Sequence, residues 1–168
     1  MNHKKGFSLI ELLIVVAIIL VIAAIAIPSL LRAKIAADEA SAARSVREIS
    51  NAETAYHIAF PQIGFAPDLI SLGGATPCFP SSASACILDD TVSTGVKSGY
   101  KLFAAGFATG GSLVNTDFVG SAAPNTFNHS GVRNFCIASE GVVRVNPGAP
   151  GLPPAADVPT CMAYAAAQ

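Results

Sequence analysis

The sequence predicts an α+β protein in which a long N-terminal helix precedes a head built on an antiparallel β-sheet. Two observations predict this division. Of the 11 proline and 14 glycine residues, only Pro28 and Gly6 lie within residues 1–60. All four cysteines lie within residues 61–168, together with the remaining prolines and glycines. Because proline and glycine interrupt helices and mark turns, the first part is predicted to be helical and the second to contain loops and strands.

The composition excludes several classes of protein. Hydrophobic residues make up 52% of the 168 residues and charged residues 12%, and the mean hydropathy is +0.54. Such a chain is too apolar to be disordered. Its net charge of −1 provides no basic surface for nucleic acid, so no specific nucleic-acid partner is expected. We expect a membrane-associated or self-associating protein rather than an enzyme, with no catalytic residue, cofactor or metal.

Residues 7–27 form an almost unbroken apolar run in which only Ser8 and Glu11 are polar. A helix of this length reaches about 32 Å, which is enough to cross a hydrocarbon core of ~30 Å. Lys4 and Lys5 precede the run and favour a cytoplasmic N-terminus. An ordinary cleaved signal peptide would end in a flexible junction after a small-residue site, whereas this chain continues with helix-forming residues. The run is therefore predicted to be a membrane span.

The helix is predicted to extend over residues 7–60. Nine alanines and no glycine lie between Pro28 and Phe60, and Pro61 ends the pattern. Pro28 should kink the helix because proline lacks a backbone N–H. A stripe with alternating spacings of four and three residues is expected to pack on the sheet, with Glu53 as its polar member: Ala42, Val46, Ile49, Glu53, Tyr56 and Phe60. The charged residues on the rest of the helix surface after Pro28, Glu39 among these, are expected to be solvated or charge-paired.

Glu11 is the only ionisable residue between Gly6 and Arg32. A charged side chain inside a bilayer costs roughly 2.5–3.5 kcal/mol, so such residues usually have a partner and a function. One interpretation is that Glu11 simply reaches the membrane interface. Another is that cleavage after Gly6 creates an α-amino group on Phe7, one turn before Glu11. The amine and the carboxylate would then pair within one chain or between neighbouring chains.

The N-terminal string resembles the class III signal of type IV pilins. Its residues are Lys4-Lys5-Gly6-Phe7-Ser8-Leu9-Ile10-Glu11-Leu12-Leu13, with Pro28 at the end of the apolar run. The resemblance implies that residues 1–6 are a leader peptide, that prepilin peptidase cleaves between Gly6 and Phe7, and that Phe7 is N-methylated. It also implies that Glu11 is the assembly carboxylate and Pro28 the helix-kinking proline. One departure is Leu20, where many members of the family carry glycine.

The head, residues 61–168, is predicted to begin with a loop over 61–99 that contains a short helical turn near Asp68–Leu72. A sheet of three or four strands should follow at about 100–146, as in the type IV pilin fold that the resemblance implies. The clearer strand candidates are Tyr100–Phe107, Val132–Ala138 and Val142–Asn146, and the weaker ones are Thr116–Val119 and Thr126–Asn128.

The four cysteines are expected to form two disulfides on the exported side of the membrane, although the sequence allows three pairings. We favour Cys78–Cys86 and Cys136–Cys161, since each pair closes a loop that contains proline or glycine. The region 136–161 would then be a terminal disulfide-bounded loop similar to the D-region of pilins. A zinc site is the competing interpretation, but the sequence contains no C-x-x-C pair.

The resemblance implies a structural subunit, the major pilin of a type IV pilus. Such a protein is an inner-membrane precursor that polymerises with itself, through the pilus assembly machinery, into an extracellular filament used for adhesion, twitching motility or DNA uptake. A pseudopilin of a type II secretion system is the alternative within the family. A membrane-tethered binding module that never polymerises is the alternative outside it.

Overall fold

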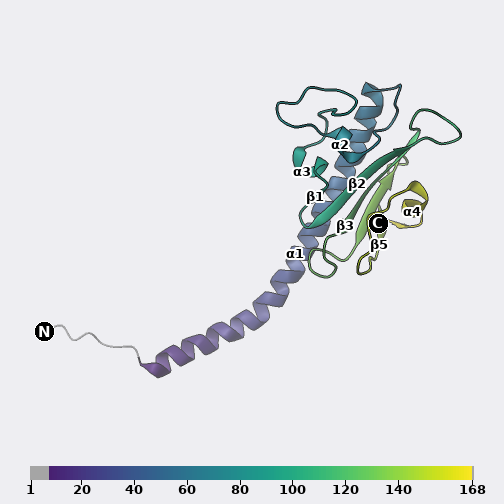
Figure 1. The fold of residues 1–168 in the computed structure, drawn as a ribbon. Coiled ribbons are helices and arrows are strands. Elements are labelled where there is room, and N and C mark those ends of the chain that lie inside the picture. The colour runs from purple at the N-terminus through teal and green to yellow at the C-terminus, as the bar shows by residue number, and fades with distance from the viewer. Residues whose placement is uncertain (1–7, 168) are drawn as a thin grey trace. The chain divides into compact units, whose positions relative to one another are not determined.

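The computed structural model describes residues 8–167, and the chain divides into two units between Lys34 and Ile35. The first unit holds the early turns of helix α1, which runs from Leu9 to Ala59. The second unit holds the later turns of α1 and the head. The other elements are α2 (Leu69–Leu72), α3 (Asp90–Ser93), β1 (Val96–Lys97), β2 (Tyr100–Phe107), β3 (Asp117–Pro124), β4 (Asn134–Ala138), β5 (Arg144–Asn146), α4 (Val158–Met162) and β6 (Ala165–Ala166) (Figure 1).

The head contains one antiparallel sheet whose strands follow chain order from β1 to β6. The α+β class and the antiparallel sheet are thus confirmed, but the sheet has six strands where three or four were predicted. β1 and β6 have two residues each, which is too short to show any periodicity. The predicted loop 61–99 contains α2, α3 and β1, and Asp68 caps α2 by accepting a hydrogen bond from the Ser71 N–H at 2.8 Å.

Four of the five predicted strand candidates differ from the structure. The candidate Thr116–Val119 overlaps the start of β3, which begins at Asp117 and continues to Pro124 through residues of low strand propensity. Gly120 is needed within this stretch because a Cβ added to it would lie 2.8 Å from Ile49 Cγ2 of α1. The candidate Thr126–Asn128 is a turn in which Asn128 adopts a left-handed backbone with φ 61°.

The candidate strands Val132–Ala138 and Val142–Asn146 both begin two residues later than predicted, as β4 and β5. For β4 the reason is visible in the hydrogen bonds. The N–H groups of Val132 and Arg133 donate to the side chain of Glu39 on α1 and are therefore not available to a strand ladder.

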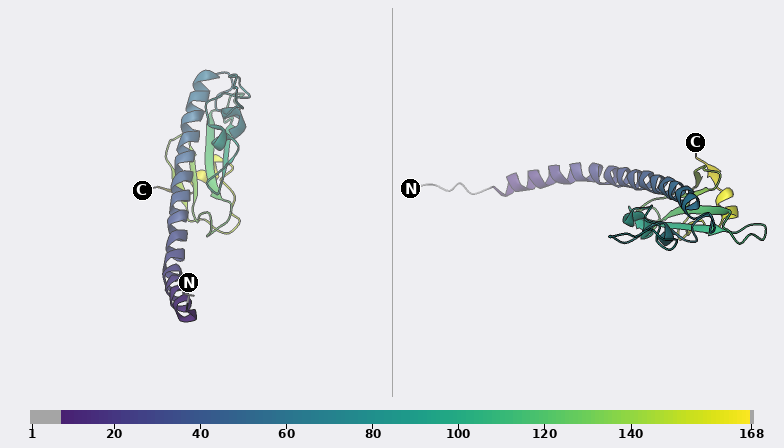
Figure 2. Two further views of the ribbon diagram at one scale, coloured as in Figure 1. Left: turned by 90° about the vertical axis from the view of Figure 1, so that its left-hand side faces the viewer. Right: turned by 90° about the horizontal axis from the view of Figure 1, so that it is seen from above.

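The later turns of α1 lie along one face of the sheet (Figure 2). The predicted stripe provides this contact: Ala42, Val46, Ile49, Glu53 and Tyr56 are buried, and Phe60 is partly buried. They pack with alternate side chains of the strands, such as Leu102 of β2 and Phe135 and Ile137 of β4.

The opposite face of the sheet carries a smaller core. Its members are Val119, Cys136, Ala155, Cys161 and Tyr164, which come from β3, β4, α4 and the segments on either side of α4. The sheet is therefore covered by α1 on one face and by the C-terminal region on the other, which gives the small head two apolar layers.

Candidate functional site

The first unit exposes the apolar side chains of α1. Every leucine, isoleucine and valine from Leu9 to Leu31 is at least 40% exposed, and several exceed 60%. Within the described residues, α1 is the one helix long and apolar enough to span a membrane, and its most apolar window has a mean hydropathy of 3.3 with none of its residues buried. A core helix of a soluble protein would bury this surface. These side chains therefore require lipid or other protein chains around them.

Glu11 lies in the first turn of α1. Its Oε2 accepts a hydrogen bond from the Ser8 N–H at 2.9 Å, and the Ser8 carbonyl accepts one from the Leu12 N–H at 3.3 Å. Ser8 thus occupies the N-cap position, and Glu11 reaches back to it as the third-position acid of a capping box does. Among the described residues, Oε1 of Glu11 has no hydrogen-bond partner. The carboxylate can cap its own helix with one oxygen and accept a cation with the other.

Pro28 lies inside α1, and the helix continues through it. Because proline has no N–H, the carbonyl of Ala24 receives no helical hydrogen bond from this position. Gly6 and Phe7 lie outside the described residues. Cleavage between them, methylation of Phe7 and a pair between its amine and Glu11 all stay predictions.

The helix is attached to the head through Glu39, which sequence analysis placed on the solvated or charge-paired surface. Glu39 is charge-paired but also buried, with 6% of its surface exposed. Its Oε1 accepts the N–H groups of Val132 and Arg133 at 3.0 and 3.1 Å, and its Oε2 lies 2.6 Å from Arg133 Nη2. Burial alone would raise the pKa of Glu39, but the Arg133 side chain and the two N–H groups together hold it below its ordinary value.

Glu53 is the second acid on the packed face of α1, and it is fully buried. Its Oε2 accepts the Ala66 N–H at 2.8 Å, and its Oε1 has no partner. Burial raises the pKa of Glu53 to about 8, and the charge of Asp68 acts in the same direction. Glu53 is therefore mostly a neutral acid at pH 7, which is how a carboxyl group can occupy an apolar interface.

Two disulfides are present, Cys78–Cys86 and Cys136–Cys161, and these are the pairs that the sequence analysis favoured. Cys136–Cys161 joins β4 to α4 within the smaller core. Two hydrogen bonds hold the proline-rich segment between Cys136 and Cys161. Ser121 Oγ donates to the Ala155 carbonyl at 2.7 Å, and Asn134 Nδ2 donates to the Pro153 carbonyl at 3.0 Å.

No set of side chains in residues 8–167 suits a metal ion. The described part of the chain contains no group of three or more histidine, cysteine, aspartate and glutamate side chains that could hold one. All four cysteines are oxidised, which removes the thiolates that zinc would need.

Residues 1–27 match the family model described as the prokaryotic N-terminal methylation motif. No curated protein and no solved structure matches the chain. The matched residues include Gly6, Phe7 and Glu11, the three positions on which the predicted cleavage, methylation and assembly depend. The motif, the apolar α1 and the antiparallel head together support a type IV pilin-like prepilin, and they fit a precursor that is anchored in the membrane. The motif implies processing by prepilin peptidase.

The sequence analysis singled out Glu11 because it is isolated in an apolar run, and it predicted the roles of Gly6 and Phe7 through the resemblance to the class III signal. It missed the burial of Glu39. The residues that bind Glu39 are 93 and 94 positions away along the chain, so no local pattern could have indicated them.

Proposed function

We propose that this protein is the major subunit of a type IV pilus. In this proposal the mature chain begins at Phe7, polymerises with itself through α1 and forms an extracellular filament that serves adhesion, twitching motility or DNA uptake. The role is structural rather than catalytic. The observation that carries the proposal is the exposed apolar surface of α1 from Leu9 to Leu31, with Glu11 as its single ionisable group.

The exposed side chains explain how one segment can serve both as a membrane anchor and as a filament core. Lipid tails are as apolar as leucine and isoleucine, so the exchange of lipid for sister helices has little net hydrophobic free energy. Close packing and specific polar contacts must then select the sister helix. In this setting one charged group has a large influence on which arrangement forms.

Glu11 is placed to make that contact. An isolated carboxylate in an apolar surrounding is unfavourable, and a nearby cation removes much of that cost. Cleavage after Gly6 would create a cationic α-amine on Phe7 and remove Lys4 and Lys5, which favour retention of the N-terminus in the cytoplasm. The Oε1 atom of Glu11 is available for an amine of a neighbouring chain, while Oε2 continues to cap α1 through the Ser8 N–H.

The capping contact suggests a sharp test with Glu11→Ala and Glu11→Gln. The glutamine amide oxygen can still accept the Ser8 N–H, but it carries no charge. If Glu11 acts as a charged partner, both variants should lose at least tenfold in surface filaments, counted by electron microscopy of sheared cell-surface material. If Glu11 only caps its helix, Glu11→Gln should assemble like the wild type, and this result would contradict the proposal.

The location of wild-type fibres in the same experiment distinguishes a pilus subunit from a pseudopilin and from a tethered module. Long wild-type fibres on the cell surface support a pilus subunit. Short fibres confined to the periplasm would indicate a pseudopilin of a secretion system. Membrane-bound protein with no fibres, unaffected by either substitution at Glu11, would indicate a tethered module that does not polymerise.

A further inference from the structure

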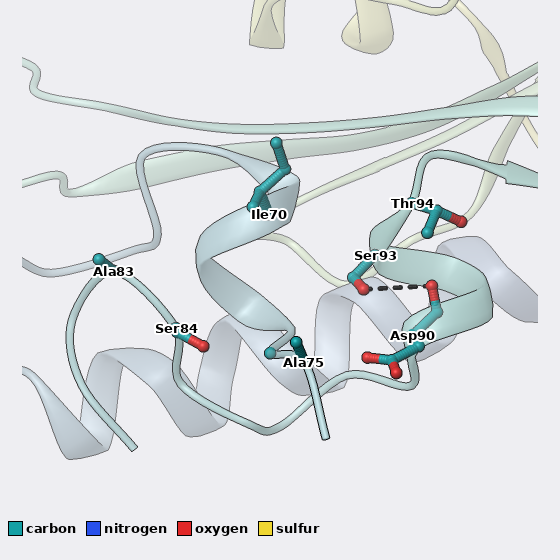
Figure 3. A pocket seen from close by; sticks show the side chains of 8 residues that line it. Ile70, Ala75, Ala83, Ser84, Asp90, Ser93 and Thr94 are labelled. Carbon is teal, nitrogen blue, oxygen red and sulfur yellow. Dashed lines mark hydrogen bonds between the residues drawn. The ribbon is translucent and has the colours of Figure 1, made fainter. Parts of the chain in front are cut away.

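A hollow of about 510 Å³ opens between α2 and α3 on the head (Figure 3). Its walls are mainly apolar and include Ile70, Ala75 and Ala83. Asp90 is the one charged residue among those that line it, and Asp90 is exposed. The Ser93 hydroxyl donates to the backbone carbonyl of Asp90 at 3.2 Å, and no hydrogen bond or ion pair within residues 8–167 engages the Asp90 carboxylate. The hollow thus combines apolar walls with one uncommitted negative charge.

Arginine is the side chain that fits this combination best. Its aliphatic stem packs on apolar surface while its guanidinium binds a carboxylate through two N–H groups. Lysine has a similar stem but presents a compact, strongly hydrated ammonium group, which loses more solvation on entering such a hollow.

The chain carries two such arginines on the exposed face of α1. Arg44 and Arg47 are exposed and lie three residues apart, so that both project from neighbouring positions on the helix surface. No hydrogen bond or ion pair in the described part of the chain engages either guanidinium. Most other cations of the head are already paired within the chain, as Lys97–Glu48, Arg133–Glu39 and Arg144–Glu140.

The two surfaces are different and complementary, which is the arrangement that an open polymer requires. A contact between two different patches on identical subunits produces a helical filament when the rotation does not close into a ring. A contact of one patch with itself produces only a closed dimer. Each subunit could bind one neighbour through the positive patch on α1 and another neighbour through the negative hollow between α2 and α3.

We propose that the hollow between α2 and α3 of one copy receives Arg44 or Arg47 from α1 of a second copy, with a guanidinium paired to Asp90. This inference rests on the proposed function, because it requires that the chain polymerises. It adds to that function a specific contact between heads, separate from the Glu11 contact between the apolar parts of α1.

Charge reversal and exchange test the contact in full-length protein in the cells that produce it. The variants are Arg44→Glu/Arg47→Glu, Asp90→Arg, and the three substitutions combined. Lys101→Glu is the matched control, since Lys101 is exposed, cationic and located on β2 away from the hollow. Asp90 is chosen instead of Asp89 because Asp89 caps α3 through the Thr91 N–H. Filaments are counted by electron microscopy, and folding of each variant is checked by thermal unfolding of the head.

The proposal predicts at least a tenfold loss of filaments for the double arginine variant and for Asp90→Arg. It predicts recovery to at least half of the wild-type level when the charges are exchanged together, and no loss for Lys101→Glu. If both reversed variants assemble as the wild type does, or if the exchange fails to restore assembly of correctly folded protein, the contact does not exist. A lowered unfolding temperature in the isolated subunits would assign the arginines to contacts within one chain and overturn the proposal.

The result for the wild type distinguishes a failure of the proposed contact between heads from a failure of the proposed function. Wild-type filaments together with unaffected variants would overturn only the contact between heads. Absence of wild-type filaments would overturn the proposed function and, with it, this inference.

Discussion

The two units of the chain differ in the exposure of the same kind of side chain on α1. In the first unit, isoleucines such as Ile18 and Ile25 of α1 are 55% and 72% exposed. In the second unit, Ile49 of the same helix is completely buried against the sheet. The later turns of α1 are stabilised by contacts within the chain, whereas the early turns can only be stabilised by lipid or by other chains. One helix thus contributes to stability within the chain through its later turns, and its early turns expose apolar side chains that need lipid or other chains around them.

This comparison predicts that the same substitution will have different effects in the two units. Ile49→Ala should reduce the free energy of unfolding of the head by about 2–5 kcal/mol, because it leaves a cavity in a packed core. Ile18→Ala is the matched control and should leave head stability unchanged. Denaturant unfolding of full-length protein in detergent can be followed by near-UV circular dichroism of tyrosine, since all three tyrosines are buried in the second unit. A similar loss of head stability for both variants would contradict the division.

The disulfides should differ in their effects because they close loops of different length. Cys136 and Cys161 are 25 residues apart, and Cys78 and Cys86 are 8 apart. Loop-closure entropy predicts that replacing the first pair by alanine destabilises the head by about 3.5 kcal/mol, and replacing the second pair by about 2.5 kcal/mol. The same unfolding measurement checks the order. A larger loss for the Cys78–Cys86 replacement would show that contacts within that loop, rather than chain entropy, determine its contribution.

Substitution of Glu53 should have a smaller effect on the free energy of unfolding, and this effect should depend on pH. Its pKa in the folded head is about 8, above the ordinary value of 4.5, so the folded state retains a proton that the unfolded state releases. Its contribution to stability is therefore present in full below about pH 4.5 and is lost as the pH rises through about 8. Glu53→Gln should remove this slope and raise the free energy of unfolding at pH 8 by about 1–3 kcal/mol, within the range for a buried polar group.

The relevant measurement is the unfolding free energy of the wild type and of Glu53→Gln between pH 4.5 and pH 9. The matched control is Glu48→Gln, because Glu48 is partly exposed and its partner Lys97 lies at the surface. Parallel pH profiles for the wild type and Glu53→Gln would show that Glu53 is ionised in the folded head.

The features that could be predicted from the sequence are those with a local or periodic cause. The apolar run, the buried stripe of α1 and strand β2 follow from composition and spacing within a few turns or residues. The position of Glu11 in the first turn of α1 follows from the apolar run, whereas the cleavage site before Phe7 stays a prediction from a short motif. The predicted strand in β3 was too short because the small residues from Gly120 onward have low strand propensity, and Gly120 is required by its contact with Ile49 of α1, far away in the sequence. The late start of β4 depends on Glu39 in the same way.

The central claim is that a trimmed, apolar α1 carries the subunit from the membrane into a filament. The most direct measurement is the N-terminal mass spectrum of this protein taken from sheared cell-surface fibres. The account predicts fibres that contain the chain, with its first residue an N-methylated Phe7. A chain that begins at Met1, a chain that begins after the apolar run as an ordinary cleaved signal peptide would leave it, or fibres that do not contain the chain would each contradict this prediction.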